Sequence, residues 1–187
     1  GLRTVLRMDP DIIFLGEIRD PENAAIALRA ASSGRFVFSS MHTRDVAATF
    51  TAFRELGIQD RSVAENLIGV VNQRLVRKLC EKCRRPCDLE PQNLETFTLH
   101  GVEIPHVVYQ PVGCDACRGV GYKGRCGVFE CVRMDAELAK AISDGASEAE
   151  IRRLIRAKGI TSLTAEVLKK ASAGITSFDE ALSVRWA

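Results

Sequence analysis

The stretch that most constrains the fold runs from Asp9 to Asp20 and reads DPDIIFLGEIRD. Its apolar residues 12–15 follow one another without polar interruption, which is typical of a short strand covered on both faces in a parallel sheet between helices. The run ends at Gly16 and Glu17 follows, so a carboxylate is expected at the carboxyl end of the strand. Open α/β sheets bind their ligands at that edge.

Glu17 has two interpretations. At the edge of such a sheet, a carboxylate can hold an attacking water or a magnesium-bound water in a nucleotide-hydrolysing enzyme. Alternatively, the strand is an ordinary core strand, and Glu17, Arg19 and Asp20 form a solvated turn after it. Four apolar residues followed by Gly-Glu are too short a pattern to decide between the two.

Strand and helix signals alternate after this stretch. Asp20 suits an N-cap and Pro21 suits the first helical position. The predicted elements are a helix over 23–33, a buried strand over 36–40, a helix over 45–56 and a helix that starts at 60 and keeps its apolar spacing to 75. This order predicts an α/β fold with a parallel sheet and flanking helices.

His42 follows the second predicted strand as Glu17 follows the first, so both are expected at the same edge of the sheet. A histidine beside an apolar strand is more often a structural hydrogen-bonding residue than a catalytic one. The position next to Glu17 favours a functional role only modestly.

Glycine motifs give little support for phosphate binding within this chain. No G-x-x-x-x-G-K-[ST] sequence occurs. A G-x-G-x-x-G sequence occurs over 119–124, but it lies between cysteines, follows no convincing strand and opens no amphipathic helix. We interpret it as a flexible turn.

Two C-x-x-C pairs predict a metal site. The four residues are Cys80, Cys83, Cys114 and Cys117. Two such pairs can deliver four thiolates to Zn²⁺ in a closed, structural site. Residues 84–113 separate the pairs, which requires an inserted loop over 89–111. The alternatives are four unlinked buried thiols or a redox C-x-x-C pair, and Cys87 is a rival ligand.

Composition narrows the function further. The net charge is only +2, and no apolar run is long enough to span a bilayer. Seven cysteines without a secretory signal indicate a reducing compartment. The basic cluster over 74–85 is read as a solvated surface, with phosphate or anionic-lipid contact as the lesser alternative. A nucleic-acid-binding zinc ribbon is disfavoured because no aromatic residues interleave this cluster.

The last third of the chain reads as short capped helices that serve packing or subunit contacts. Ser147 and Glu150 form a capping box, and Ser177 with Glu180 repeats its spacing. The predicted helices begin near 135, 147, 161 and 177, and the first three end near glycines 145, 159 and 174.

Taken in order, these segments resemble the C-terminal part of the type II secretion and type IV pilus assembly ATPases, the GspE- and PilB-like branch of the secretion ATPases. LRMDPDIIFLGEIRD resembles the Walker B segment and SGRFVFSSMHTRD the His box. NQRLVRKLCEKC and GCDACRGVGYKGRCGVFE resemble the tetracysteine metal module. GASEAEIRRLIRAKGITSL and AGITSFDEAL resemble the C-terminal helices. The resemblance covers essentially the whole chain.

The resemblance implies a fold and an activity. The fold would be a partial RecA-like core over 1–75, a zinc-binding four-Cys module over 76–131 and a helical subdomain over 132–187. The full-length protein would be a hexameric cytoplasmic ATPase, peripheral at the inner membrane, that uses ATP and Mg²⁺ to drive pilus or pseudopilus assembly and protein export. Its partners would be an inner-membrane platform protein and other secretion-system proteins, without nucleic acid.

The resemblance also implies roles for individual residues. Glu17 would be the Walker B glutamate, Arg19 a supporting residue of the same turn, and His42 the His-box residue near the γ-phosphate. The four thiolates named above would bind a structural zinc. Retraction ATPases of the superfamily lack these cysteines, which favours an assembly or secretion role.

Departures from the family pattern limit what the chain is expected to do alone. The Walker A loop, Asp box and N-terminal arginines are expected upstream, which makes the chain a fragment, and it is predicted not to hydrolyse ATP by itself. Ser40, Met41 and Arg44 differ from the residues expected in the His box. The alternative function is a zinc-stabilised module that docks an inner-membrane platform protein without turnover.

Overall fold

A computed structural model describes residues 8–185 and divides the chain into two compact units. The first unit comprises the residues up to Val71 together with Cys131–Ile160. The second comprises Asn72–Glu130 and the residues from Thr161 onward. Each unit therefore contains two separate stretches of sequence.

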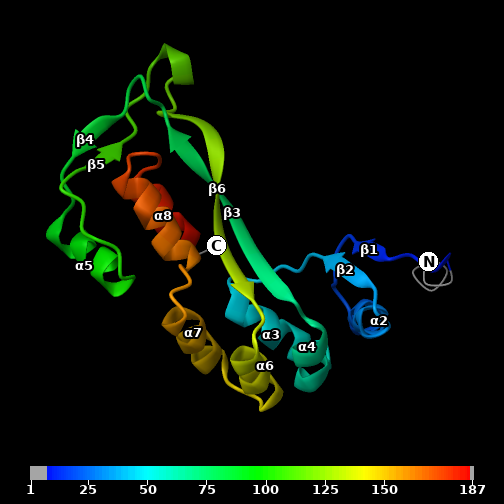
Figure 1. The fold of residues 1–187 in the computed structure, drawn as a ribbon. Helices are drawn as coiled ribbons and strands as arrows, with labels where there is room; N and C mark the ends of the chain where they lie inside the picture. Colours follow the sequence, from blue (N-terminus) through cyan, green and yellow to red (C-terminus); the bar gives the residue numbers. More distant parts are fainter. Residues whose placement is uncertain (1–7, 186–187) are drawn as a thin grey trace. The chain divides into compact units, whose positions relative to one another are not determined.

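A small parallel sheet opens the first unit. Strand β1 (Ile12–Leu15) lies beside β2 (Phe36–Ser39) (Figure 1). The two strands pair in parallel, with Leu15 opposite Ser39. Helix α2 (Pro21–Ser32) connects the strands, and the Asp20 carboxylate caps it by accepting a hydrogen bond from the backbone N–H of Asn23 at 2.8 Å. The predicted strand–helix–strand unit with a parallel sheet is therefore confirmed.

The expectation that these strands are covered on both faces is wrong within the described residues. Ile13 and Leu15 are buried, whereas Ile12 and Phe14 are 64% and 77% exposed. The phenylalanines of β2 are exposed on the same face. The uninterrupted apolar run therefore marks two apolar faces, of which the described chain covers one.

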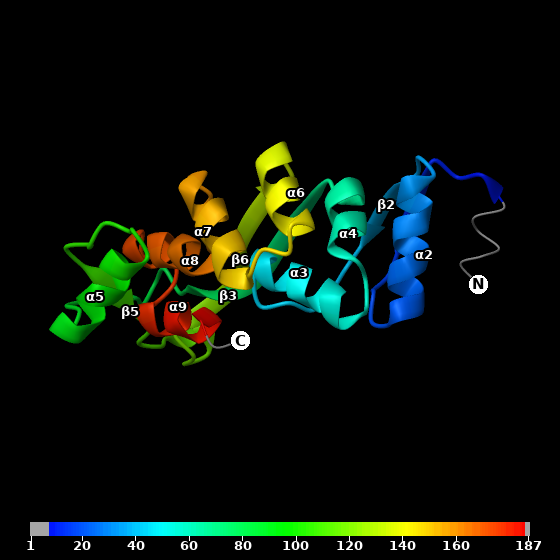
Figure 2. The same ribbon diagram turned by 90° about the horizontal axis from the view of Figure 1, so that it is seen from below.

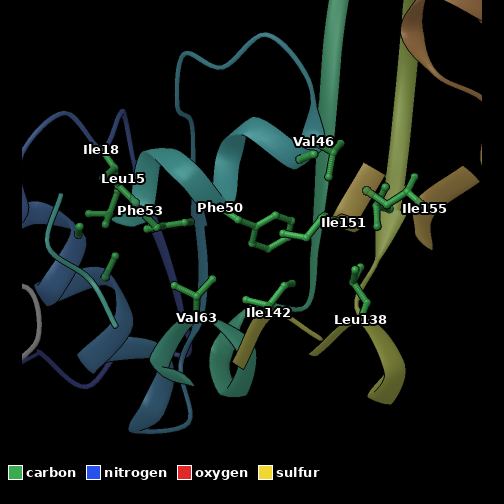
Figure 3. Close-up of a cluster of buried hydrophobic side chains, with 14 of the residues drawn as sticks. Leu15, Ile18, Val46, Phe50, Phe53, Val63, Leu138, Ile142, Ile151 and Ile155 are labelled. Atoms are coloured by element: carbon green, nitrogen blue, oxygen red, sulfur yellow. The ribbon is translucent and has the colours of Figure 1, made fainter. Parts of the chain in front are cut away.

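The described residues of the first unit form four further helices, which are α3 (Val46–Glu55), α4 (Asp60–Asn66), α6 (Ala136–Ser143) and α7 (Glu148–Ala157) (Figure 2). Their apolar faces meet around Phe50, which points toward Ile151 with Ile142 nearby (Figure 3). Residues from both stretches of sequence thus form one core.

The helix predicted from 60 to 75 is wrong in its second half. Helix α4 ends at Asn66, and Gly69–Leu79 forms strand β3, which is hydrogen-bonded to β6 (Tyr122–Arg133). The apolar residues of β3 are mostly β-branched and suit a strand, although their spacing also matches a helix. A Cβ at Gly69 would lie 2.8 Å from the carbonyl oxygen of Val132, so the close strand pairing depends on glycine.

The second unit has its own core. Strand β4 (Arg85–Cys87) pairs antiparallel with β5 (Val108–Gln110), and the helices are α5 (Pro91–Leu99), α8 (Leu163–Ser172) and α9 (Phe178–Arg185). The rings of Phe97 and Phe178 stack with centroids 5.6 Å apart. The segment 89–111, expected as a loop, therefore contains a helix and a strand.

The predicted caps of the last helices are confirmed. Ser147 and Glu150 form a complete capping box at α7. The Ser162 hydroxyl caps α8, and the Ser177 hydroxyl accepts a hydrogen bond from the backbone N–H of Glu180 at 3.1 Å. Among the described helices, none combines the length and apolarity needed to cross a membrane.

Candidate functional site

Glu17 and His42 meet at the carboxyl ends of β1 and β2. The parallel register places the ends of the two strands side by side, and two hydrogen bonds fasten them. The Ser40 hydroxyl donates to the carbonyl oxygen of Gly16 at 2.7 Å, and the backbone N–H of Ile18 donates to the carbonyl oxygen of Ser40 at 2.9 Å. The turns that carry both side chains are thereby held together.

The Glu17 carboxylate is shared between two partners. Arg19 Nε lies 2.6 Å from Oε2, and His42 Nε2 lies 3.0 Å from Oε1. The carboxylate is 18% exposed, whereas the imidazole is 87% exposed. The hydrogen bond from Arg19 lowers the pKa of Glu17 below its ordinary value, and the charge of His42 adds to this effect.

This arrangement is chemically competent for general base or metal-water chemistry. An ionised carboxylate at a strand end can orient a water or the hydration shell of a divalent cation. The imidazole beside it is open to an incoming ligand because most of its surface is exposed. The structure brings together all three residues predicted for this site, and their roles stay predictions.

Sequence reasoning missed two residues beside this site. The loop after His42 is tied to α7 by Glu148, which binds Arg44, and by Arg152, which binds Asp45. Only the i,i+4 spacing of Glu148 and Arg152 was visible in the sequence, and that spacing is common on any solvated helix.

The four predicted cysteines form one cluster. The sulfur atoms of Cys80, Cys83, Cys114 and Cys117 all lie within 4.8 Å of one another. Three of the Sγ–Sγ distances are 3.9, 3.8 and 3.8 Å. A tetrahedral site with Zn–S bonds of about 2.3 Å requires sulfur atoms about 3.8 Å apart, so the donor set fits zinc.

Backbone N–H groups donate hydrogen bonds to two sulfur atoms of this cluster, which stabilises negatively charged thiolates. The N–H groups of Cys114 and Gly121 each donate to Cys117 Sγ at 3.2 Å, and that of Gly113 donates to Cys83 Sγ at 3.3 Å. Burial acts to raise the pKa of Cys117, but these bonds outweigh it and lower the pKa to about 6. Burial dominates at Cys83 and raises its pKa to about 11.

The remaining thiols stand apart from the cluster. Cys87, the expected rival ligand, packs against the core of the second unit and is not among the four clustered sulfurs. Cys131 is exposed, and all seven cysteines carry free thiols.

Comparisons with known proteins identify the family of the chain. The family model described as type II/IV secretion system protein matches residues 1–183. The chain is 42% identical over 184 residues to the type IV pilus assembly ATPase PilB of Thermus thermophilus, covering 98% of this chain and 21% of that protein. It is 38% identical over 184 residues to the type II secretion system ATPase E of Vibrio cholerae, covering 98% of this chain and 36% of that protein.

Solved structures support the same fold. The pilus retraction motor PilT with bound ADP superposes with a TM-score of 0.67 at 20% identity, over 98% of this chain and 42% of that one. The ATPase DotB of Legionella pneumophila superposes with a TM-score of 0.65 at 23% identity, over 100% of this chain and 42% of that one. The chain thus spans less than half the length of each of these relatives. It belongs to the type II/IV secretion system protein family.

Proposed function

We propose that this chain is the part of a secretion or pilus-assembly motor ATPase that carries the catalytic carboxylate and a structural zinc module. The full-length protein would hydrolyse ATP to drive pilus or pseudopilus assembly and protein export. The observation that carries the proposal is the contact between Glu17 and His42 at the carboxyl ends of two parallel strands.

Each residue of the site has a part in this proposal. Glu17 orients the attacking water or the hydration shell of the magnesium ion. Arg19 keeps the carboxylate ionised through its 2.6 Å hydrogen bond. His42, which is mostly exposed, would face the γ-phosphate of bound ATP. Bound Mg-ATP would supply the phosphoanhydride bond that is cleaved.

The 187 residues alone are proposed to bind nucleotide weakly and to be inactive. The sequence lacks a G-x-x-x-x-G-K-[ST] loop, whose backbone amides and lysine would hold the phosphates. Calorimetry with Mg-ATP tests this, and micromolar affinity of the isolated chain would contradict it.

The organisation of the protein is proposed along the same lines. Residues 1–75 would belong to a RecA-like core and 76–131 to the zinc module. The helices expected over 132–187 would support both parts, because α6 and α7 belong to the first unit and α8 and α9 to the second. The full-length protein would act as a cytoplasmic hexamer at the inner membrane, with a platform protein as partner.

A second candidate is a zinc-stabilised docking module that works without turnover. Val112 and Val120 favour it, because they are 56% and 60% exposed beside the second cysteine pair. Exposed apolar side chains on a rigid metal-held turn suit contact with another protein.

Measuring ATP turnover distinguishes the motor from the docking module. Mg-ATP hydrolysis is measured on the longest native chain that contains these residues, for wild type and Glu17→Gln. Glu55→Gln is the control, since Glu55 is exposed on α3. A loss of at least a hundredfold in Glu17→Gln with nucleotide binding retained supports the motor. No turnover in wild type, with the oligomer intact, supports the docking module.

A further inference from the structure

The loop that carries His42 is fastened on both sides of the histidine. On one side, Ser40 is bonded to the β1 turn at Gly16 and Ile18. On the other side, Arg44 and Asp45 reach α7. His42 therefore lies between two anchors, each within three residues of it along the chain.

The second anchor centres on the Asp45 carboxylate. Its Oδ1 accepts a hydrogen bond from the backbone N–H of Ala48 at 2.8 Å and so caps α3. Its Oδ2 accepts from Arg152 Nη2 at 2.8 Å and from Nε at 3.3 Å. One carboxylate thus joins the start of α3 to α7.

Arg152 extends this anchor to Arg44. Its Nη2 also lies 2.5 Å from Glu148 Oε1, and that same carboxylate binds Arg44. The hydroxyl of Thr51 donates to Glu148 Oε2 at 3.1 Å. The side chains of Arg152 and Glu148 are 32% and 20% exposed, so this ion-pair network is partly shielded from solvent.

We propose that Arg152 is a positioning residue for ATP hydrolysis, which holds His42 in contact with Glu17 by anchoring Asp45 and, through Glu148, Arg44. The inference rests on the proposed function. Arg152 touches neither reacting group. It acts by limiting where the loop can place the imidazole, and errors of about 1 Å in such placement cost roughly a hundredfold in rate.

The first test uses Arg152→Gln in the longest native chain. The value of kcat for Mg-ATP is expected to fall ten- to hundredfold, with KM within twofold of wild type, because a misplaced imidazole loses contacts in the transition state and not in the bound ground state. Arg152→Lys should recover part of kcat, since it keeps the charge but loses the guanidinium fork. Arg153→Gln, an exposed neighbour on α7, is the control.

A second variant shows whether a loss of kcat comes from the lost contact or from misfolding. Asp45→Asn keeps a good N-cap for α3 but removes the charge that Arg152 binds. It is expected to lower kcat as Arg152→Gln does, with a melting temperature close to that of wild type.

A double-mutant cycle separates positioning from general structural support. In a His42→Ala background, Arg152→Gln should change kcat less than twofold, because the histidine it positions is gone. Equal fold losses with and without His42 would overturn the inference, as would wild-type kcat in both Arg152→Gln and Asp45→Asn. Absence of turnover in wild type would instead overturn the proposed function, and the inference with it.

Discussion

Nε2 of His42 lies 3.0 Å from a carboxylate oxygen of Glu17, although a helix and a strand separate the two residues in the chain. The contact depends on the parallel pairing of β1 and β2, which ends both strands at one edge with Leu15 opposite Ser39. A shift of one residue in this register would turn the buried side chains of one strand to the other face of the sheet and displace the turn that carries Glu17 or His42.

Removing Arg19 should move the acid limb of the activity profile. Its hydrogen bond is the main cause of the lowered pKa of Glu17, so in Arg19→Gln the pKa of Glu17 rises toward its ordinary value. The carboxylate then becomes protonated at a higher pH, and kcat/KM of the full-length protein should start to fall at a higher pH than in wild type. The pH dependence of kcat/KM measures this. Arg61→Gln breaks a comparable exposed ion pair with Glu65 and should leave the profile unchanged.

Glu180 should make stability depend on pH. Burial acts to raise the pKa of its carboxyl, but hydrogen bonds from the side chain and backbone N–H of Arg77 outweigh burial and leave the pKa below 4.5. Because the folded-state pKa is the lower one, the stabilisation is fully present above pH 4.5 and is lost as pH falls through the folded-state pKa.

Glu180→Gln should therefore lower the free energy of unfolding by about 1–3 kcal/mol at pH 7, the typical worth of hydrogen bonds to a buried charged group. The difference from wild type should shrink in acid. Urea unfolding of both proteins at pH 7 and in acid, below the folded-state pKa of Glu180, measures this difference. Asp179→Asn is the control, because Asp179 is on the exposed side of α9. A difference that persists unchanged at low pH would contradict the assignment.

Metal content should follow the four clustered thiols. Purified under reducing conditions, the chain should hold about one Zn²⁺, and Cys117→Ser should reduce this toward zero and lower the melting temperature. Elemental analysis and thermal melting give the two readouts. Cys131→Ser should retain the metal, because Cys131 lies outside the cluster. Metal-free wild type from reducing buffer would refute the zinc site.

Gly113 should be essential to the shape of this cluster. Its φ is +111°, and an added Cβ would lie 2.5 Å from the carbonyl oxygen of Gly119. Gly113→Ala should therefore displace the N–H that donates to Cys83 Sγ and weaken zinc binding by tenfold or more in a chelator competition. Gly119→Ala is the matched control, since its φ is +79° with open space around the Cβ position. Similar affinities of the two variants would rule out the steric argument.

Phe97 should be a principal contributor to the stability of the second unit. It is fully buried and stacks on Phe178, so Phe97→Ala should lower the free energy of unfolding by about 3–5 kcal/mol. Leu99→Ala, on the same helix but with Leu99 73% exposed, should stay within about 0.5 kcal/mol of wild type. Chemical denaturation followed by circular dichroism compares them.

Local signals in the sequence were reliable where local physics decides the structure. Asp20 and Ser147 cap helices as the sequence predicted, since a cap involves only neighbouring residues. The C-x-x-C pairs were equally informative, because the spacing of ligands restricts the geometry of a metal site.

Non-local pairing was not predictable in the same way. Val71 and Leu75 continue the helical spacing of α4, yet they lie in β3 because a strand far along the chain, β6, pairs with it. The ion pairs of Arg152 with Asp45 and of Arg44 with Glu148 likewise join residues more than a hundred positions apart. No local pattern encodes such contacts.

The discontinuous course of the chain through its two units has a consequence for synthesis on the ribosome. The core around Phe50 needs Ile142 and Ile151, which emerge only after the whole of Asn72–Glu130 has been translated. That later stretch in turn needs Leu168 and Phe178. The first core cannot close before Ile151 has been translated, nor the second before Phe178, so the apolar segments made earlier stay exposed on the nascent polypeptide and prone to aggregation during that time.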